Sequence, residues 1–147
     1  AAEQLPFADA TFDAVFGKQV LHHLELDTAI PEIARVLHPG GKAVFLEPLI
    51  HNPLLEGYRR LTPHLRSPTE RALSMHDLQR VGAYFGRWSH KEFCLLAALP
   101  ALIEALTSKG PALTRIRLWL QKADRKLVDT VPFIGRYCWE TVITLER

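Results

Sequence analysis

The sequence predicts an α/β fold whose strands lie in a sheet covered by helices on both faces. An apolar run at 12–16 is typical of a buried parallel strand, and residues 43–46 predict a second strand. Between these runs, Ile30, Ile33 and Leu37 recur at helical spacing. A strand, a crossover helix and a second strand form a right-handed βαβ unit, so we expect the two strands to be parallel neighbours.

One more helix and two more strands are predicted further along the chain. The segment from Ser74 to Phe85 has a helical pattern, and Ser74 and Asp77 have the spacing of a capping box. The segments 88–96 and 137–145 carry the alternation that is typical of strands. The chain therefore contains enough strands for a small sheet of its own.

Four short motifs follow one another in the first third of the chain. They are, in order, Leu5-Pro6-Phe7, Phe12-Asp13-Ala14-Val15, Leu21-His22-His23-Leu24 and Arg35-Val36-Leu37-His38-Pro39-Gly40-Gly41. In this order and spacing they resemble the second half of a class I S-adenosylmethionine-dependent methyltransferase domain. The most similar group is the small-molecule methyltransferases that include the quinone-biosynthesis C-methyltransferases. The ordered set carries the resemblance, which extends from Ala1 to about Pro48.

The resemblance implies the C-terminal half of a Rossmann-like methyltransferase sheet, with strands in the family's order 4-5-7-6 and the last strand antiparallel. The Gly-x-Gly-x-Gly loop that holds the methionine part of the cofactor in this family is missing from the sequence. The one close glycine pair, Gly40-Gly41, follows a predicted helix and does not join a strand to a helix as that loop does. We therefore expect residues 1–147 to be a single partial domain taken from a longer protein. Its strand at 12–16 should then have an unpaired edge.

The resemblance also implies S-adenosyl-L-methionine as the cofactor and places its contacts in two loops. Ala1, Ala2 and Glu3 match the family's adenine-contacting loop, where relatives often carry an aspartate in the first position. Lys18 and Gln19 follow the first strand, at the edge where ligands bind in open α/β sheets. The alternative interpretations are a solvated loop carboxylate for Glu3 and an ordinary surface lysine for Lys18.

The acceptor side is expected to begin where Glu47 ends the second strand. Residues 49–75 contain several prolines and are predicted to form an acceptor-side lid rather than a simple crossover. Glu47, His51, Asn52 and Tyr58 are the candidate substrate-binding residues, and His51 is also a weak candidate for a catalytic base. A polar turn and ordinary core packing are the simpler explanation for each of them.

Other polar groups near these candidates are expected to be structural. His22 and His23 could deprotonate an acceptor, but we expect them to pack or to form local hydrogen bonds. Glu32 and Arg35 lie three residues apart on a helix and predict a weak surface pair.

Residues 97–130 are predicted to form a helical insertion of two helices, at 97–106 and 113–128. Leucines and an isoleucine fall on one face of the second helix, and basic residues lie elsewhere on it. This insertion could extend the acceptor pocket, rest on a membrane surface, or pack on itself and on the sheet. We favour packing over the membrane, and the exposure of Trp119 distinguishes between them.

Composition narrows the class of protein further. The 147 residues include 48% hydrophobic and 23% charged residues, as in a globular domain, and a net charge of +2 gives no indication of a nucleic-acid partner. Cys94 and Cys138 lack the spacing of a metal site and are expected to be buried thiols of a cytoplasmic protein.

Two functions are compatible with these observations. The first is an enzyme that transfers the methyl group of S-adenosyl-L-methionine to a small and possibly lipophilic acceptor, with the isolated 147 residues inactive. Such transfer depends mainly on the alignment of the reacting atoms, so few catalytic side chains are needed. The second is a non-catalytic methyltransferase-like module that supplies an interaction surface.

Overall fold

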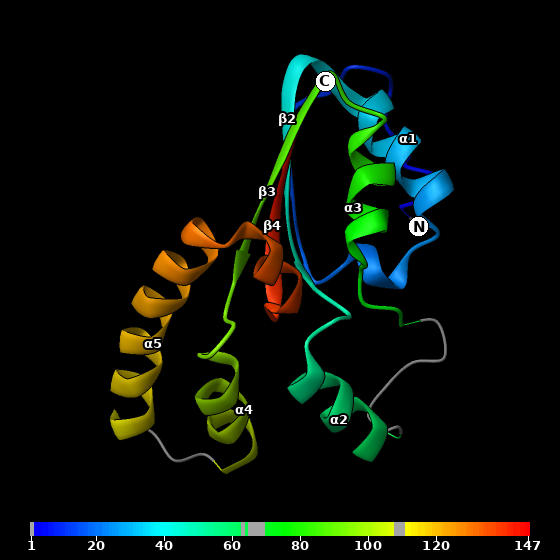
Figure 1. The fold of residues 1–147 in the computed structure, drawn as a ribbon. Coiled ribbons are helices and arrows are strands. Elements are labelled where there is room, and N and C mark those ends of the chain that lie inside the picture. Colours follow the sequence, from blue (N-terminus) through cyan, green and yellow to red (C-terminus); the bar gives the residue numbers. More distant parts are fainter. Residues whose placement is uncertain (1, 63, 65–69, 108–110) are drawn as a thin grey trace. The chain divides into compact units, whose positions relative to one another are not determined.

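The computed structural model describes residues 2–62, 64, 70–107 and 111–147, which form the elements shown in Figure 1. In chain order the elements are β1 (Phe12–Lys18), η1 (Leu21–His23), α1 (Leu26–Val36), β2 (Leu37–Pro48), α2 (Pro53–Leu61), α3 (Met75–Gly82), β3 (Arg87–Phe93), α4 (Ala98–Thr107), α5 (Pro111–Thr130), η3 (Pro132–Tyr137) and β4 (Glu140–Glu146). The chain divides into two compact units. The first comprises Ala1–Pro48, Ser67–Lys91 and Thr141–Arg147, and the second comprises Leu49–Arg66 and Glu92–Glu140.

The four strands form one sheet in the order β1-β2-β4-β3. β1 and β2 are parallel, as the βαβ pattern predicted. The start of β2 bonds to the end of β4 through Gly40 and Arg147, and Leu49 bonds to Trp139 just before β4. β4 is therefore antiparallel to β2. The predicted order, with the last strand antiparallel and next to the second, is confirmed.

β1 is more exposed than the sequence suggested. Its apolar run predicted a buried strand, but Gly17 is its one buried residue, and Phe16 is 73% exposed. β1 lies at the outer edge of the sheet, where it has β2 as its neighbour among the strands that the structure describes. The prediction of a buried strand was wrong for this reason, whereas the predicted unpaired edge is present.

α1 and α3 cover the same face of the sheet and lie side by side (Figure 1), joined by an ion pair between Asp27 and Arg80. The apolar spacing predicted α1, which buries Ala29, Ile30 and Ile33. The predicted helical cover of the opposite face stays a prediction.

The start of α3 is fixed by the predicted capping box. The Oγ of Ser74 accepts a hydrogen bond from the backbone N–H of Asp77 at 3.1 Å, and Asp77 Oδ2 accepts from the backbone N–H of Ser74 at 2.9 Å. Burial would raise the pKa of Asp77, but the hydrogen bonds from Ser74 and the charges of Arg71 and Arg80 lower it below its usual value. Asp77 is therefore a charged cap at neutral pH.

The chain enters β2 through an irregular stretch that contains Gly40 and Gly41. α1 ends at Val36 without an intervening loop, and Gly40 has a φ of +80°, which favours glycine. A Cβ on Gly41 would lie 3.1 Å from the carbonyl oxygen of Asp13. The two glycines therefore let the bulged start of β2 pass close to β1, whose register shifts between Phe12 and Ala14.

The second unit contains α2, α4, α5 and η3. The helices α4 and α5 pack together, close to the predicted boundaries. Asp124 of α5 is buried, and its carboxylate accepts backbone N–H bonds from Leu95, Leu96 and Ala97 at 2.8–3.0 Å. These donors belong to the turn that leads into α4, so a side chain of one helix fixes the entry to the other. β3 ends earlier than predicted, because Cys94 has a φ of +63°.

Candidate functional site

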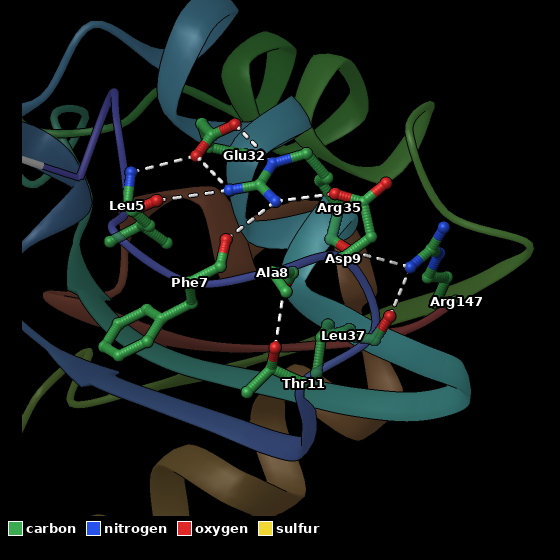
Figure 2. Close-up of polar contacts among 9 residues, drawn as sticks. All are labelled: Leu5, Phe7, Ala8, Asp9, Thr11, Glu32, Arg35, Leu37 and Arg147. Carbon is green, nitrogen blue, oxygen red and sulfur yellow. Dashed lines mark hydrogen bonds and ion pairs between the residues drawn. The ribbon is translucent and has the colours of Figure 1, made fainter.

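The loop that precedes β1 is held by the guanidinium of Arg35, as Figure 2 shows. Its Nη1 donates to the carbonyl oxygen of Phe7 at 2.9 Å and to Asp9 Oδ1 at 2.7 Å, and its Nη2 donates to the carbonyl oxygen of Leu5 at 3.2 Å. One side chain on α1 therefore holds this loop by two backbone carbonyls and one side chain. We call Arg35 and its partner Glu32 the arginine clamp.

Glu32 completes the arginine clamp from one turn earlier on α1. Its two carboxylate oxygens accept from Nε and Nη2 of Arg35 at 2.7 and 2.9 Å, and Oε2 also accepts from the backbone N–H of Leu5 at 2.9 Å. The hydrogen bond from Arg35, followed by that from Leu5, lowers the pKa of Glu32 to about 2. The predicted pair is present, and both side chains also bind the loop, which its spacing in the sequence did not predict.

The predicted residues Lys18 and Gln19 lie where β1 ends, beside the parallel strand β2. Gln19 has a φ of +52° and donates its backbone N–H to the carbonyl oxygen of Leu46 at 2.8 Å. Just before them, a Cβ on Gly17 would come within 2.5 Å of the Phe45 ring. The side chain of Lys18 is exposed. The turn is therefore closely packed on its inner side and open on its outer side.

The carboxylate of Glu47 fixes the chain that follows this turn. Oε1 accepts from the backbone N–H groups of Val20 and Leu21, both at 2.9 Å, and Oε2 accepts from that of His22 at 3.4 Å. The Nδ1 atom of His22 lies 2.8 Å from the same Oε2. Glu47 is fully buried, so its oxygens are satisfied by these donors rather than by solvent.

A hollow of about 380 Å³ lies beside η1, lined among others by His22, Glu25, Arg71 and Arg80. The backbone N–H of Arg71 donates to the carbonyl oxygen of His22 at 2.9 Å and so ties the two sides together. Arg71 and Arg80 both pair with carboxylates outside the hollow's lining, so the positive charges of this hollow are largely neutralised.

The structure describes two of the three residues that were predicted to contact the adenine, Ala2 and Glu3. Ala1 lies outside the described residues, and Ala2 and Glu3 form a turn at the start of the loop. Glu3 Oε1 accepts from the backbone N–H of Glu25 at 3.3 Å, just before α1. The carboxylate of Glu3 thus contacts the helix start, and its role in cofactor binding stays a prediction.

The remaining acceptor-side candidates belong to the second unit. Asn52 is buried and caps α2, since its Oδ1 accepts from the backbone N–H groups of Leu54 and Leu55 at 3.1 Å. Its Nδ2 donates to the carbonyl oxygen of Tyr137 at 2.8 Å. His51 is exposed and Tyr58 is half-buried. Substrate binding by His51, Asn52, Tyr58 and Glu47 stays a prediction, and Asn52 and Glu47 have structural tasks as well.

The two cysteines have environments that suppress thiolate chemistry. Burial raises the pKa of the Cys138 thiol to about 12 and also raises that of Cys94. Both thiols are therefore protonated at neutral pH and are poor nucleophiles. Within the part of the chain that the structure describes, no three His, Cys, Asp or Glu side chains are grouped to hold a metal ion.

Sequence comparison identifies the N-terminal part of the chain. A family model described as a methyltransferase domain matches residues 1–45, which include the arginine clamp and the turn at Lys18. The predicted resemblance to S-adenosylmethionine-dependent methyltransferases is confirmed.

Curated methyltransferases match the same region. An uncharacterized methyltransferase of Mycobacterium tuberculosis is 49% identical over 41 residues, which are 28% of this chain and 17% of that protein. The ubiquinone/menaquinone biosynthesis C-methyltransferase UbiE of Chromobacterium violaceum is 51% identical over 49 residues, 31% of this chain and 19% of that enzyme. The matching segment spans less than a quarter of the length of each of these relatives.

Solved methyltransferases share the fold of the whole chain. Geranyl diphosphate C-methyltransferase from Streptomyces coelicolor superposes with a TM-score of 0.61 and 16% identity, over 100% of this chain and 52% of that enzyme. Phosphoethanolamine N-methyltransferase 2 of Haemonchus contortus gives a TM-score of 0.58 and 16% identity, over 99% of this chain and 35% of that enzyme. The methyltransferase fold thus continues beyond the residues that the family model matches.

Proposed function

We propose that residues 1–147 belong to an S-adenosyl-L-methionine-dependent methyltransferase that acts on a small acceptor. The match of residues 1–45 to the methyltransferase family supports this proposal, and so does the fold of the whole chain. The solved neighbours also favour this cofactor, because their structures contain S-adenosyl-L-methionine or S-adenosyl-L-homocysteine.

The observation that carries the proposal is the preformed backbone at the carboxyl end of β1. Open α/β sheets bind ligands at this edge. At this edge Glu47 holds the backbone from Val20 to His22. The arginine clamp holds the loop at Leu5–Asp9, which leads to the amino end of β1. We propose that Ala1, Ala2, Glu3, Lys18 and Gln19 contact the cofactor at this edge, where Glu3 contacts the start of α1. Rigid support of this kind lowers the entropy cost of binding.

The acceptor is proposed to be small, and the names of the quinone-biosynthesis and geranyl diphosphate enzymes favour a lipophilic one. The relatives and neighbours are named for quinone biosynthesis, geranyl diphosphate and phosphoethanolamine, so their acceptors differ in polarity but not in being small. We propose that Tyr58 and Asn52 contribute to the acceptor side of the complete protein, with His51 as a base where the nucleophile begins protonated.

The bound cofactor would supply an activated methyl group on its sulfur. The chain's own contribution is alignment, because methyl transfer requires the nucleophile, the methyl carbon and the leaving sulfur to lie in line. Side chains that fix backbone, such as Arg35 and Glu47, can therefore matter more to rate than any acid or base. A site in which the cofactor supplies the reactive group and the protein supplies alignment needs few reactive side chains.

Calorimetric titration tests the proposal. S-adenosyl-L-homocysteine is titrated into the full gene product that contains these residues and, separately, into the 147-residue chain. We expect binding to the full gene product and weak or no binding to the 147 residues, since β1 leaves a strand edge open. Absence of binding to both would reject the enzyme and favour a non-catalytic module. Equal binding to both would show that the 147 residues are not a partial cofactor site.

A further inference from the structure

One face of α5 points away from the packing of the second unit. Its inner side is marked by Asp124, which fixes the entry to α4, and by Arg117, which pairs with Glu104 of α4 at 3.1 Å. At 3.6 residues per turn, Trp119 lies on the opposite side of the helix from Asp124. Trp119 is 68% exposed, which is unusual for the largest apolar side chain. Packing of α4 against α5 therefore leaves this face uncovered.

The outward face of α5 has an apolar band. Ile116, Trp119 and Leu127 are all exposed and lie within about one third of the helix circumference. Val131, immediately after the helix, continues the band with a further exposed side chain. Single exposed apolar residues are common, but several on one side of a helix, with half-buried Leu120 and Ala123 between them, indicate an interaction surface.

A basic band runs beside the apolar band. Arg115, Lys122 and Lys126 are spaced at i, i+7 and i+11, so they form one stripe, and all three are exposed. Within the described ranges, none of the three makes an ion pair. Asp124 is buried and bound to backbone, so Asp129 is the one acidic side chain of α5 left to oppose this stripe.

We propose that this face of α5 binds the surface of a membrane that contains anionic lipids. Tryptophan and aliphatic side chains enter the interfacial region of a bilayer, while neighbouring lysines and arginines meet the negative headgroups. An apolar band flanked by a basic band has this arrangement. A nucleic acid would use the basic band but would leave Ile116 and Leu127 in water.

We propose that α5 binds at the surface of the membrane and does not cross it. No helix in the described parts of the chain is both long enough and apolar enough to cross a bilayer. α5 would instead lie in the plane of the interface, with its inner side still packed on α4. The inference goes beyond the proposed methyl transfer, and its test requires neither cofactor nor acceptor.

Vesicle co-sedimentation of the full gene product tests the inference. One set of vesicles contains phosphatidylcholine alone, and the other contains phosphatidylcholine with 30% phosphatidylglycerol (about one anionic lipid in three). We expect sedimentation with the anionic vesicles at low salt and roughly tenfold weaker partitioning when salt screens the charges. Hydrogen exchange of residues 113–131 in the unmodified protein should slow when the anionic vesicles are present.

Two variants and two matched controls locate the surface. W119S removes the largest side chain of the apolar band, and K122E/K126E reverses two charges of the basic band. Each is expected to lower partitioning roughly tenfold or more. L61S removes an exposed leucine from α2, and K91E reverses an exposed lysine on β3, and both should partition as the parent does.

The results of these experiments distinguish between a membrane and a nucleic acid as the partner of this face of α5. Binding to anionic vesicles that both variants weaken, with slower exchange at 113–131, supports the inference. Absence of vesicle binding, or binding that neither variant changes, overturns it. Binding of single-stranded RNA by the same face without any vesicle binding also overturns it and assigns the basic band to nucleic acid.

Discussion

His22 Nδ1 lies 2.8 Å from Glu47 Oε2, and both side chains are buried at the carboxyl end of β2. Glu47 simultaneously accepts two backbone hydrogen bonds of 2.9 Å, from Val20 and Leu21. A single buried carboxylate therefore connects the end of β2 to the chain that leaves β1. The proposed site depends on this connection, because Lys18 and Gln19 lie immediately before it.

Replacement of Glu47 should destabilise the first unit. E47A leaves the buried backbone donor of Leu21 and the part-buried donor of Val20 without this acceptor, at an expected cost of about 2–4 kcal/mol in the free energy of unfolding. Urea unfolding measures this cost. E56A, which removes an exposed carboxylate from α2, should change stability by less than about 0.5 kcal/mol. An E47A variant as stable as E56A would contradict the role assigned to Glu47.

The arginine clamp should require the guanidinium and not merely a positive charge. R35K retains the charge but loses the planar fork that reaches Leu5, Phe7 and Glu32 together. We expect the amides of Leu5, Ala10 and Thr11 to exchange roughly tenfold faster in R35K. R60K changes an exposed arginine of α2 in the same way and should leave this exchange unaltered. Unchanged loop protection in R35K would show that the clamp does not order the loop.

The stability that Glu32 provides should depend on pH in a defined window. The pKa of Glu32 is lowered from 4.5 to about 2 in the folded protein, so its contribution is fully present above pH 4.5 and is lost as the pH falls through about 2. Unfolding of the parent and of E32Q should therefore differ by a constant amount from neutral pH to about pH 5, and the difference should shrink below that. A difference that grows on acidification would contradict this sign.

Two glycine substitutions should have opposite effects. A Cβ at Gly17 would lie 2.5 Å from the Phe45 ring and 2.8 Å from Val20 Cγ1, so G17A is expected to destabilise by about 1–3 kcal/mol. A Cβ at Gly57 in α2 would meet nothing within 4 Å, so G57A is expected to stabilise by about 0.5–1 kcal/mol. Thermal unfolding compares the two variants, and a tolerated G17A would contradict the packing described for this turn.

Asp124 should be the most sensitive acidic residue of α5. D124N replaces one of the two carboxylate oxygens that accept from Leu95, Leu96 and Ala97 with an amide group that cannot accept, with an expected cost of about 1–3 kcal/mol. D129N alters an exposed carboxylate on the same helix and should stay within about 0.5 kcal/mol of the parent. The comparison by urea unfolding is independent of any methyltransferase activity. Equal stability of the two variants would refute this role of Asp124.

Much of the first unit could be predicted because its determinants are local in the sequence. The apolar spacing of Ile30 and Ile33 predicts α1, and the separation of Ser74 and Asp77 predicts the capping box. The alternation near residue 140 predicts β4. These patterns depend on residues within one or two turns of each other, so neighbours along the chain suffice to recognise them.

The contacts that hold the proposed site could not be predicted in this way. Arg35 is 26–30 residues from its partners in the loop, and Glu47 is 25–27 residues from its donors. The spacing of Glu32 and Arg35 predicts their ion pair, but it does not predict that the loop at Leu5–Asp9 binds to both side chains. The exposure of β1 depends on strand order, and that of Trp119 depends on how α4 packs, so neither follows from local composition.

Hydrogen exchange of the full gene product with and without S-adenosyl-L-homocysteine tests the central claim most directly. The proposed function predicts slower exchange in the loop at residues 2–9 and in the segment 17–22, with α4 unchanged. Binding of the compound without protection of either segment would contradict the proposed site.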